Sequence, residues 1–463
     1  MHRIRQASAV LSALALSVAL AACSPATDEP ADPDACTLAF LASADRPTAE
    51  QDAYKEVFAD FENEYNCHVD TTFEGTWDQI TQQLTAARLA GTQVNLFITS
   101  TATRDLAKAG LTMDLSGCIA PFQDRFVDSA MAPYTIGERN WAVPLSSTDT
   151  SAIIYNADMF EELGIAPPET YAELVAAGET IAEAKGIVPM IHQGKSPWYW
   201  PMWYMASFAQ TSGNRSVEYT EDFLSGNRSF ASSEEEAALA ALADFTADGL
   251  LDRATLDTDE QGMYATFLQQ KAAMFFALTP SLINISDSEP DFTVGVLQFP
   301  RITTDPQVLP QVGGGPENGL AVASFAPEST KEASCQLVEF MSRPDVAAKL
   351  MAPTNPLVPS VVGVPATASE PLAPQLTAEF IPNTIPFLDW IWPAPVNDAV
   401  TTAITDVMYA DTSPQEAAQS VQAALDKVRA EEDYTFDWWS TWSEDDWARV
   451  SFPHDMSIEV GEG

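Results

Sequence analysis

CTLAFL (residues 36–41), CHVDTTF (67–73) and VNLFI (94–98) are short apolar runs of the kind that form strands. Side chains at helical spacing separate these runs. The first helical face comprises Tyr54, Val57, Phe58, Phe61 and Tyr65, and the second comprises Trp77, Ile80, Leu84 and Arg88. Strands that alternate with helices form a mainly parallel sheet covered by helices. The sequence therefore predicts an α/β fold.

The chain is too long for a single hydrophobic core, since cores stop growing near ~250–300 residues. We predict an N-terminal α/β lobe of residues 36–142 and 313–375 and a C-terminal α/β lobe of residues 143–312 and 376–430. Residues 431–463 form an acidic extension with four tryptophans. Because aromatic side chains at this density need packing partners, we expect the extension to dock on the body; a surface for a partner is the alternative.

The first 35 residues carry an export pattern. A positive segment with Arg3 and Arg5 precedes an uncharged apolar run over residues 7–19, which is too short to span a bilayer. We therefore predict a removable signal peptide over residues 1–22. Residues 23–35 are rich in Pro, Asp and Ala and lack large apolar side chains, which is typical of a disordered tether.

Leu20-Ala21-Ala22-Cys23 resembles the lipobox of bacterial lipoproteins. The resemblance implies cleavage before Cys23 and lipidation of that cysteine. It also implies that the lipid anchor holds the protein at the extracytoplasmic face of the bacterial cell membrane. An ordinary signal peptide with a chance cysteine is the alternative.

The composition excludes some classes of partner. The chain has 66 acidic and 22 basic residues and a net charge of −44. Nucleic-acid binding and electrostatic docking on anionic lipid both need positive surfaces. We therefore predict no nucleic-acid partner and no membrane contact besides the lipid anchor.

Four further cysteines suggest disulfides in an exported chain, and they allow three pairings. We favour Cys36–Cys67, because each residue opens a strand-like run and neighbouring parallel strands bring their starts together. Cys118 and Cys335 would then join distant segments. Free buried thiols are the alternative.

The chain contains no complete catalytic or metal-binding motif. It lacks H-E-x-x-H and G-x-S-x-G, and Asn318 stands where a dinucleotide fingerprint beginning at Gly313 needs its last glycine. We therefore predict no enzyme, no cofactor and no metal site. The rival hypothesis is a secreted lipoprotein enzyme that cleaves polysaccharide with two carboxyl groups ~5–9 Å apart, a spacing that sequence does not reveal.

Several short segments together carry a family resemblance: NLFI (95–98), LAKAGL (106–111), VP (143–144), IIYNADMF (153–160), KAAM (271–274), GGG (313–315) and SPQEA (413–417). In this order they resemble extracellular solute-binding protein family 1, which includes maltose-binding protein. The resemblance implies a two-domain periplasmic-binding-protein-like (type II) fold with a hinge and an interdomain cleft. It also implies a monomer that delivers a small solute to ABC permease subunits.

A sugar site needs aromatic faces for C–H groups and polar partners for hydroxyl groups. The resemblance implies both in the cleft. The implied ligand-binding residues are Asp45, Arg46, Trp77, Thr101, Asp149, Trp198, Tyr199, Trp200, Gly314, Trp390 and Trp392. For the tryptophans, burial in the core is the alternative, and we expect one of Trp390 and Trp392 to face inward.

Two positions depart from the maltose-type proteins. Thr101-Ala102 stand where those proteins carry a charged pair, and Thr279-Pro280-Ser281 stand where they carry a tryptophan. The ligand is therefore not expected to be maltose-like by direct inheritance. We predict an extracellular solute-binding lipoprotein that captures a mono- or oligosaccharide for an ABC importer, with a non-sugar solute as the alternative.

Overall fold

The structure is a computed structural model that describes residues 36–76, 79–354, 357–366, 372–431, 434–452, 456, 458, 460 and 461. The predicted signal peptide, Cys23, the tether and Trp77 lie outside the described residues. From Cys36 onward the chain forms one unit, which contains two separate β-sheets of five and six strands.

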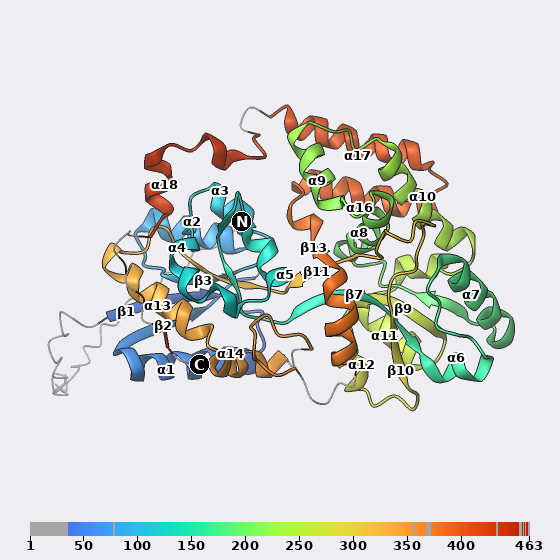
Figure 1. Cartoon of the computed structure of the whole chain (residues 1–463), viewed down its shortest axis with the longest axis horizontal. Helices are drawn as coiled ribbons and strands as arrows, with labels where there is room; N and C mark the ends of the chain where they lie inside the picture. Colours follow the sequence, from blue (N-terminus) through green and yellow to red (C-terminus); the bar gives the residue numbers. More distant parts are fainter. Residues whose placement is uncertain are drawn as a thin grey trace, which may run out of the picture. The chain divides into compact units, whose positions relative to one another are not determined.

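The first sheet has the strand order β2-β1-β3-β12-β6 (Figure 1). The strands are β1 Cys36–Ala42, β2 Cys67–Phe73, β3 Leu96–Thr99, β6 Val143–Pro144 and β12 Gly319–Val322. β1 pairs in parallel with β2 and β3, whereas β12 runs antiparallel to β3 and β6. The α/β alternation predicted from the first three apolar runs is confirmed.

Successive residues of a strand point to opposite faces of the sheet, and helices cover both of these faces. Phe40 packs in a core with the apolar side chains of α1, whereas Leu41 packs with those of α2 and α3. The helices of this region are α1 Thr48–Tyr65, α2 Ile80–Ala90, α3 Thr103–Lys108, α4 Ser116–Ile119, α5 Asp128–Met131, α13 Lys331–Met341 and α14 Pro344–Met351. As predicted, α1 buries Tyr54, Val57, Phe58 and Phe61.

Two disulfides join segments of this region. Cys36 lies opposite Cys67 in the register of β1 and β2, and their Cα atoms are 4.5 Å apart. Cys118 of α4 is bonded to Cys335 of α13, with Cα atoms 5.8 Å apart. These are the pairs favoured by the sequence, because neighbouring parallel strands do begin at the same edge of the sheet.

The second sheet has the order β13-β11-β7-β9-β8, and β10 pairs with β7. Its strands are β7 Thr148–Asn156, β8 Val188–Ile191, β9 Ala272–Leu278, β10 Val294–Leu297, β11 Val312–Pro316 and β13 Thr384–Pro386. β7 is buried over almost its whole length. A short hairpin of β4 Thr135–Ile136 and β5 Arg139–Asn140 stands apart from both sheets.

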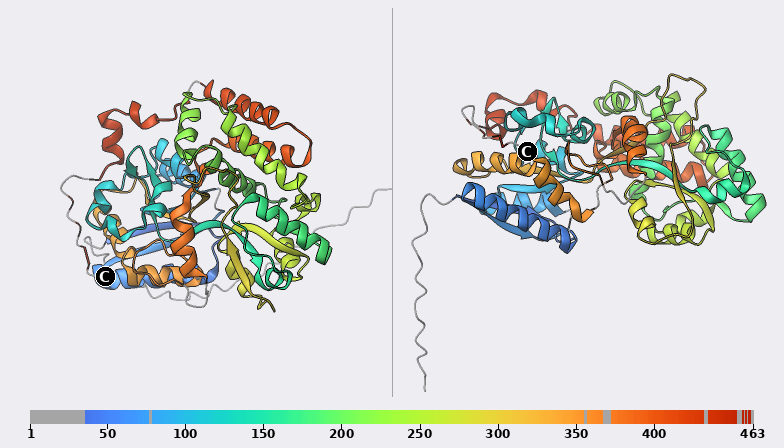
Figure 2. Two further views of the ribbon diagram at one scale, coloured as in Figure 1. Left: turned by 45° about the vertical axis from the view of Figure 1, so that its right-hand side comes forward. Right: turned by 60° about the horizontal axis from the view of Figure 1, so that its bottom comes forward.

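Helices from distant parts of the sequence enclose the second core. Figure 2 shows α10, α16 and α17 side by side, and their apolar faces belong to one core cluster. The helices of this region are α6 Ala157–Leu163, α7 Tyr171–Lys185, α8 Trp200–Thr211, α9 Ser216–Ser225, α10 Ser233–Ala247, α11 Glu260–Leu268, α12 Ser281–Ser286, α15 Ala373–Gln375, α16 Ala394–Tyr409 and α17 Pro414–Arg429.

The chain crosses between the two sheets on short segments. Residues 145–147 connect β6 to β7, and residues 317–318 connect β11 to β12. The Ser146 hydroxyl donates a hydrogen bond to the Asn318 carbonyl at 3.1 Å, so the two crossings touch. The lobe boundaries expected from the sequence lie near these crossings and stay predictions.

The described part of the C-terminal extension packs on the body and includes α18 Glu444–Val450. Trp438, Trp442 and Trp447 surround the buried ring of Trp141, with ring centroids 5.8, 6.0 and 6.1 Å from it. Trp438 is itself buried. The aromatic side chains of the extension therefore contact the rest of the chain, as the sequence led us to expect.

Candidate functional site

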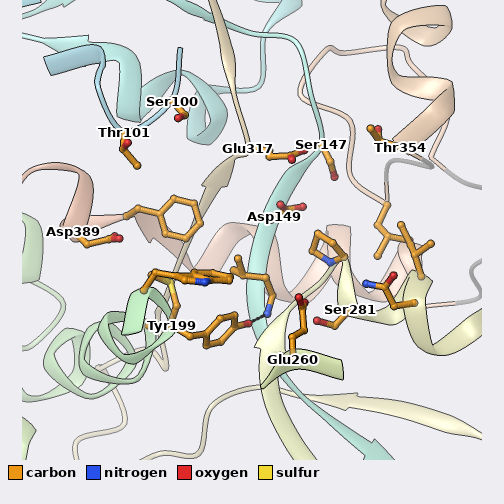
Figure 3. Close-up of a pocket in the computed structure, with 18 of the residues that line it drawn as sticks. Ser100, Thr101, Ser147, Asp149, Tyr199, Glu260, Ser281, Glu317, Thr354 and Asp389 are labelled. Carbon is orange, nitrogen blue, oxygen red and sulfur yellow. Dashed lines mark hydrogen bonds between the residues drawn. The ribbon is translucent and has the colours of Figure 1, made fainter. Parts of the chain in front are cut away.

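A cavity of about 660 Å³ is lined by residues from both sheet regions and from the crossings between them. Thr101 follows β3 of the first sheet, and Tyr199 precedes α8 beside the second sheet. Ser147 and Glu317 lie on the two crossing segments (Figure 3). This volume falls within the ~300–1,000 Å³ typical of small-molecule sites. A ligand here would therefore touch both regions at once.

Buried polar residues at the start of β7 mark this site. Residues 148–151 of β7 are buried although they are polar, and Asp149 lines the cavity. Gly315 of β11 lies opposite Asp149 in the strand register. A Cβ atom on Gly314 would lie 2.4 Å from the Asp149 carbonyl oxygen. Glycine at position 314 therefore permits the close approach of β11 and β7.

Aromatic side chains form another part of the cavity wall. Trp198 and Tyr199 have ring centroids 4.8 Å apart, and Trp198 is 53% exposed. Phe387 and Trp390 have ring centroids 5.3 Å apart. Aromatic faces that remain accessible to a solute can stack on the C–H groups of a sugar ring.

Three acidic groups of the cavity have perturbed ionisation. Burial, reinforced by the charge of Glu317, raises the pKa of Asp149 well above its usual value, while a hydrogen bond with Ser147 opposes the shift. Burial raises the pKa of Asp389 to about 7. Burial also raises the pKa of Glu317. Removal from water disfavours the charged form of each carboxyl group.

Asp149→Asn is expected to stabilise the ligand-free protein increasingly as the pH rises above about 4. The folded protein resists ionisation of Asp149 whereas the unfolded chain does not, so the wild type loses stability as pH climbs towards the raised pKa. Asparagine does not ionise, so the stability of the variant does not fall in this way as the pH rises. Thermal unfolding between about pH 4 and pH 8 measures the difference. Asp445→Asn, at an exposed position of α18, is the control, and a pH-independent difference for Asp149→Asn contradicts the assignment.

Five residues that the sequence suggested do line the cavity: Thr101, Asp149, Trp198, Tyr199 and Trp390. They come from segments up to about 290 positions apart, and the tertiary structure brings them together. Their roles in binding stay predictions.

Asp45 and Arg46 do not line the cavity. Asp45 is exposed, whereas Arg46 is buried and pairs through Nη1 with Glu50 Oε2 at 2.5 Å. Glu50 of α1 is the residue that reaches the cavity. The acidic–basic pair expected after β1 is therefore replaced by a glutamate one helical turn later, with Arg46 beside it.

Trp200, Trp392 and Gly314 also lie outside the cavity wall. Trp200 is 1% exposed and donates its indole N–H to the Gly194 carbonyl at 3.0 Å. Trp392 is buried in the second core. Trp198 and Tyr199 reach the cavity from the turn before α8, whereas Trp200, the first residue of α8, is buried in the core. Of the pair Trp390 and Trp392, the second is the one that faces inward.

Several polar residues of the wall were missed by sequence analysis. Glu260 and Tyr264 lie one turn apart on α11, and Ser281 begins α12. Glu317 directly follows the glycine-rich β11, and Asp389 directly precedes Trp390. Glu317 and Asp389 could have been found from the sequence, because each stands next to a segment that was already assigned to the cleft. The α11 and α12 residues carry no such signal, because only packing of these helices beside β9 brings them to the cavity.

Within the described residues, no group of three or more His, Cys, Asp or Glu side chains has a geometry suited to a metal ion. A search of the same residues finds no helix with the length and apolarity needed to cross a membrane.

Comparison with known proteins places the chain in a family. The family described as bacterial extracellular solute-binding protein matches residues 46–348. The multiple sugar-binding protein of Streptococcus mutans serotype c (strain ATCC 700610 / UA159) is 23% identical over 424 residues, which cover 90% of this chain and 96% of that protein. Both comparisons include strands of both sheets.

Solved structures share the fold. A chitin oligosaccharide binding protein has a TM-score of 0.70 at 22% identity, covering 86% of this chain and 100% of its own. The solute-binding protein RafE in complex with raffinose has a TM-score of 0.64 at 20% identity, covering 85% of this chain and 100% of its own. With the family match over residues 46–348, these findings show that the chain belongs to the bacterial extracellular solute-binding protein family and has its type II periplasmic-binding-protein-like fold.

Proposed function

We propose that this protein captures a carbohydrate in the cavity between its two sheet regions and delivers it to an ABC importer. The observation that carries the proposal is the lining itself. Aromatic rings at Trp198 and Trp390 share one cavity with hydroxyl and carboxyl groups such as those of Ser147 and Asp149. This combination suits a ring with apolar C–H faces and polar hydroxyl edges. Several similar proteins are named for the sugars that they bind, which supports the same class of ligand.

The proposal includes closure of two lobes on the solute. One proposed lobe contains the first sheet, including β6 (143–144), and the other contains the second sheet, including β11 (312–316). The short crossings at 145–147 and 317–318 are suited to act as the hinge. A solute that touches both lobes favours the closed form, which is the form that an importer would recognise.

A sugar panel tests the proposed function. Thermal-shift screening with mono- and oligosaccharides, polyols and non-sugar solutes is followed by calorimetric titration of each hit. We expect a raised melting temperature with at least one sugar and no change in that sugar after prolonged incubation. If only non-sugar solutes bind, the carbohydrate assignment is wrong.

A second candidate function is cleavage of polysaccharide by two carboxyl groups. The raised pKa values of Asp149 and Asp389 favour it, because a glycosidase needs one carboxyl group that stays protonated near neutral pH. Chromatography of each incubated oligosaccharide separates the two functions. Cleavage that disappears in Asp149→Asn supports the enzyme and contradicts a purely binding role.

We also propose lipid attachment at Cys23 and location at the extracytoplasmic face of the cell membrane. The support is the Leu20-Ala21-Ala22-Cys23 pattern after an apolar run. Metabolic labelling with radioactive palmitate is expected to mark the wild type and not Cys23→Ala. Equal labelling of both proteins contradicts the proposal.

A further inference from the structure

The cavity is lined by an unusual number of acidic side chains. Five carboxyl groups belong to its wall: Glu50, Asp149, Glu260, Glu317 and Asp389. Among its described lining residues there is no lysine, arginine or histidine. In Figure 3, Asp149 lies between Glu317 and Ser147 on one side and Glu260 on the other. Carboxyl groups therefore converge on the space that the solute is proposed to occupy.

Little of this charge is balanced by the protein. Arg46, which does not line the cavity, pairs with Glu50 at 2.5 Å, and its charge also opposes the raised pKa of Glu317. Within the described residues, none of the other four carboxyl groups forms a salt bridge with a basic side chain. The Oδ1 atoms of Asp149 and Asp389 are buried and have no hydrogen-bond partner among the described residues. Asp149 is only 6% exposed. Its buried oxygen without a hydrogen-bond partner is a second, independent indication that a bound solute supplies a hydrogen-bond donor at this position.

We infer that the solute is an amino sugar or a short amino-sugar oligosaccharide, whose protonated amine lies among these carboxyl groups. The inference rests on the proposed function and narrows it from carbohydrate to basic carbohydrate. An ammonium group supplies three hydrogen-bond donors and one positive charge. Its hydrogen bonds to carboxylates are stronger than those of a neutral hydroxyl group.

A neutral sugar explains the aromatic rings but not the acids. Hydroxyl groups carry no charge, so a neutral sugar would leave Asp149, Glu317 and Asp389 to be buried without a compensating cation. A protonated amine compensates that charge directly. Burial raises the pKa of both Asp149 and Asp389, and a nearby cation favours their ionised forms again.

The aromatic part of the wall distinguishes an amino sugar from a simple polyamine. Trp198 and Trp390 offer wide faces on which the C–H groups of a sugar ring stack. The same faces attract an adjacent cation. A flexible polyamine would use the charge of the site but would leave these ring platforms without a matching surface. An amino sugar therefore accounts for both the aromatic and the acidic side chains of the cavity wall.

Matched oligosaccharides test the inference by calorimetric titration at about pH 6.5, where a sugar amine is protonated. Chitosan, chitin and cellulose oligosaccharides of equal length share one backbone and differ only in an amine, an acetamide or a hydroxyl group. A second series compares glucosamine, galactosamine and mannosamine, each with its neutral parent sugar. This series makes the result independent of the glycosidic linkage that the first three oligosaccharides share. We expect at least one amine to bind tenfold or more tightly than its neutral counterparts. Salt is expected to weaken this preference.

Two variants connect the preference to the carboxyl groups. Asp149→Asn and Asp389→Asn are expected to reduce the preference for the amine at least fivefold while far-UV circular dichroism stays unchanged. Asp445→Asn, which removes an exposed acid on α18, is expected to keep the full preference. A preference that survives both cavity variants overturns the assignment of the amine to these residues.

The outcomes separate the inference from the proposed function. If a neutral sugar binds as tightly as its amine, the inference is wrong and the carbohydrate-binding function stands. If spermidine binds more tightly than every sugar, the amino-sugar identity is wrong. If no sugar of either kind binds, the proposed function itself fails.

Discussion

Trp390→Ala is expected to weaken binding of the solute by about 100-fold, which corresponds to about 3 kcal/mol. Large aromatic side chains in enclosed pockets carry much of the binding free energy at recognition sites. Trp390 lines the cavity and packs against Phe387, and its ring centroid is 6.3 Å from that of Tyr134 near the first sheet. Loss of the indole would remove the stacking surface and admit water. Calorimetric titration with the tightest solute of the sugar panel measures the change.

Two controls separate stacking from general damage. Trp390→Phe keeps an aromatic face and is expected to retain most of the affinity. Trp447→Ala removes a tryptophan of the extension, outside the cavity wall, and is expected to leave the affinity unchanged. An affinity of Trp390→Ala within about threefold of the wild type would show that this ring does not contact the solute.

Truncation after Ala430 is expected to lower the free energy of unfolding by about 5 kcal/mol or more. Trp438, Val450 and Phe452 of the extension are 4%, 2% and 7% exposed, and burial of each such side chain stabilises a fold by ~1.5–3 kcal/mol. The truncation also uncovers Trp141, which is fully buried. A fall in melting temperature of about 5 °C or more follows from this loss. Thermal and denaturant unfolding measure it.

Charged contacts add to the docking of the extension. The guanidinium of Arg139 lies 4.1 Å from the ring centroid of Trp447, and that of Arg104 lies 4.2 Å from the ring centroid of Phe436. Cation–π pairs of this kind stabilise by ~0.5–2 kcal/mol each. Trp198→Ala, which removes a half-exposed tryptophan from the cavity, is the control and is expected to keep the wild-type melting temperature. An unchanged melting temperature after truncation would show that the extension is not part of the stable core.

The truncated protein is expected to retain its affinity for the solute, because no described residue after Trp390 lines the cavity. The stability and binding measurements therefore report on different parts of the molecule. Loss of binding without loss of stability would contradict the location of the binding site in the cavity between the two sheet regions.

Local sequence patterns predicted much of the framework. The helical spacing of Tyr54, Val57 and Phe61 and the apolar runs around β1 and β2 were sufficient for the α/β alternation. The same strand starts led to the Cys36–Cys67 pair. These features depend on residues close together in sequence, or on a rule of parallel pairing that holds in any such sheet.

Prediction of the cavity residues required more than local sequence patterns. Resemblance to a family led to Asp149, Trp198 and Trp390, but also to Trp200 and Trp392, which are buried in the core. Neighbouring aromatic residues look alike in a sequence, and only the course of the folded chain decides which of them lines the cavity and which is buried in the core.

The amino-acid sequence alone therefore establishes the α/β class, the strand starts that the first disulfide joins and the supply of aromatic and acidic side chains. The folded chain alone decides that Glu50, Glu260 and Asp389 meet Asp149 around one cavity. The physical reason is the distance along the sequence between the residues that determine each feature. Helical periodicity and strand alternation are set by residues a few positions apart, whereas this cavity is assembled by packing contacts between residues hundreds of positions apart.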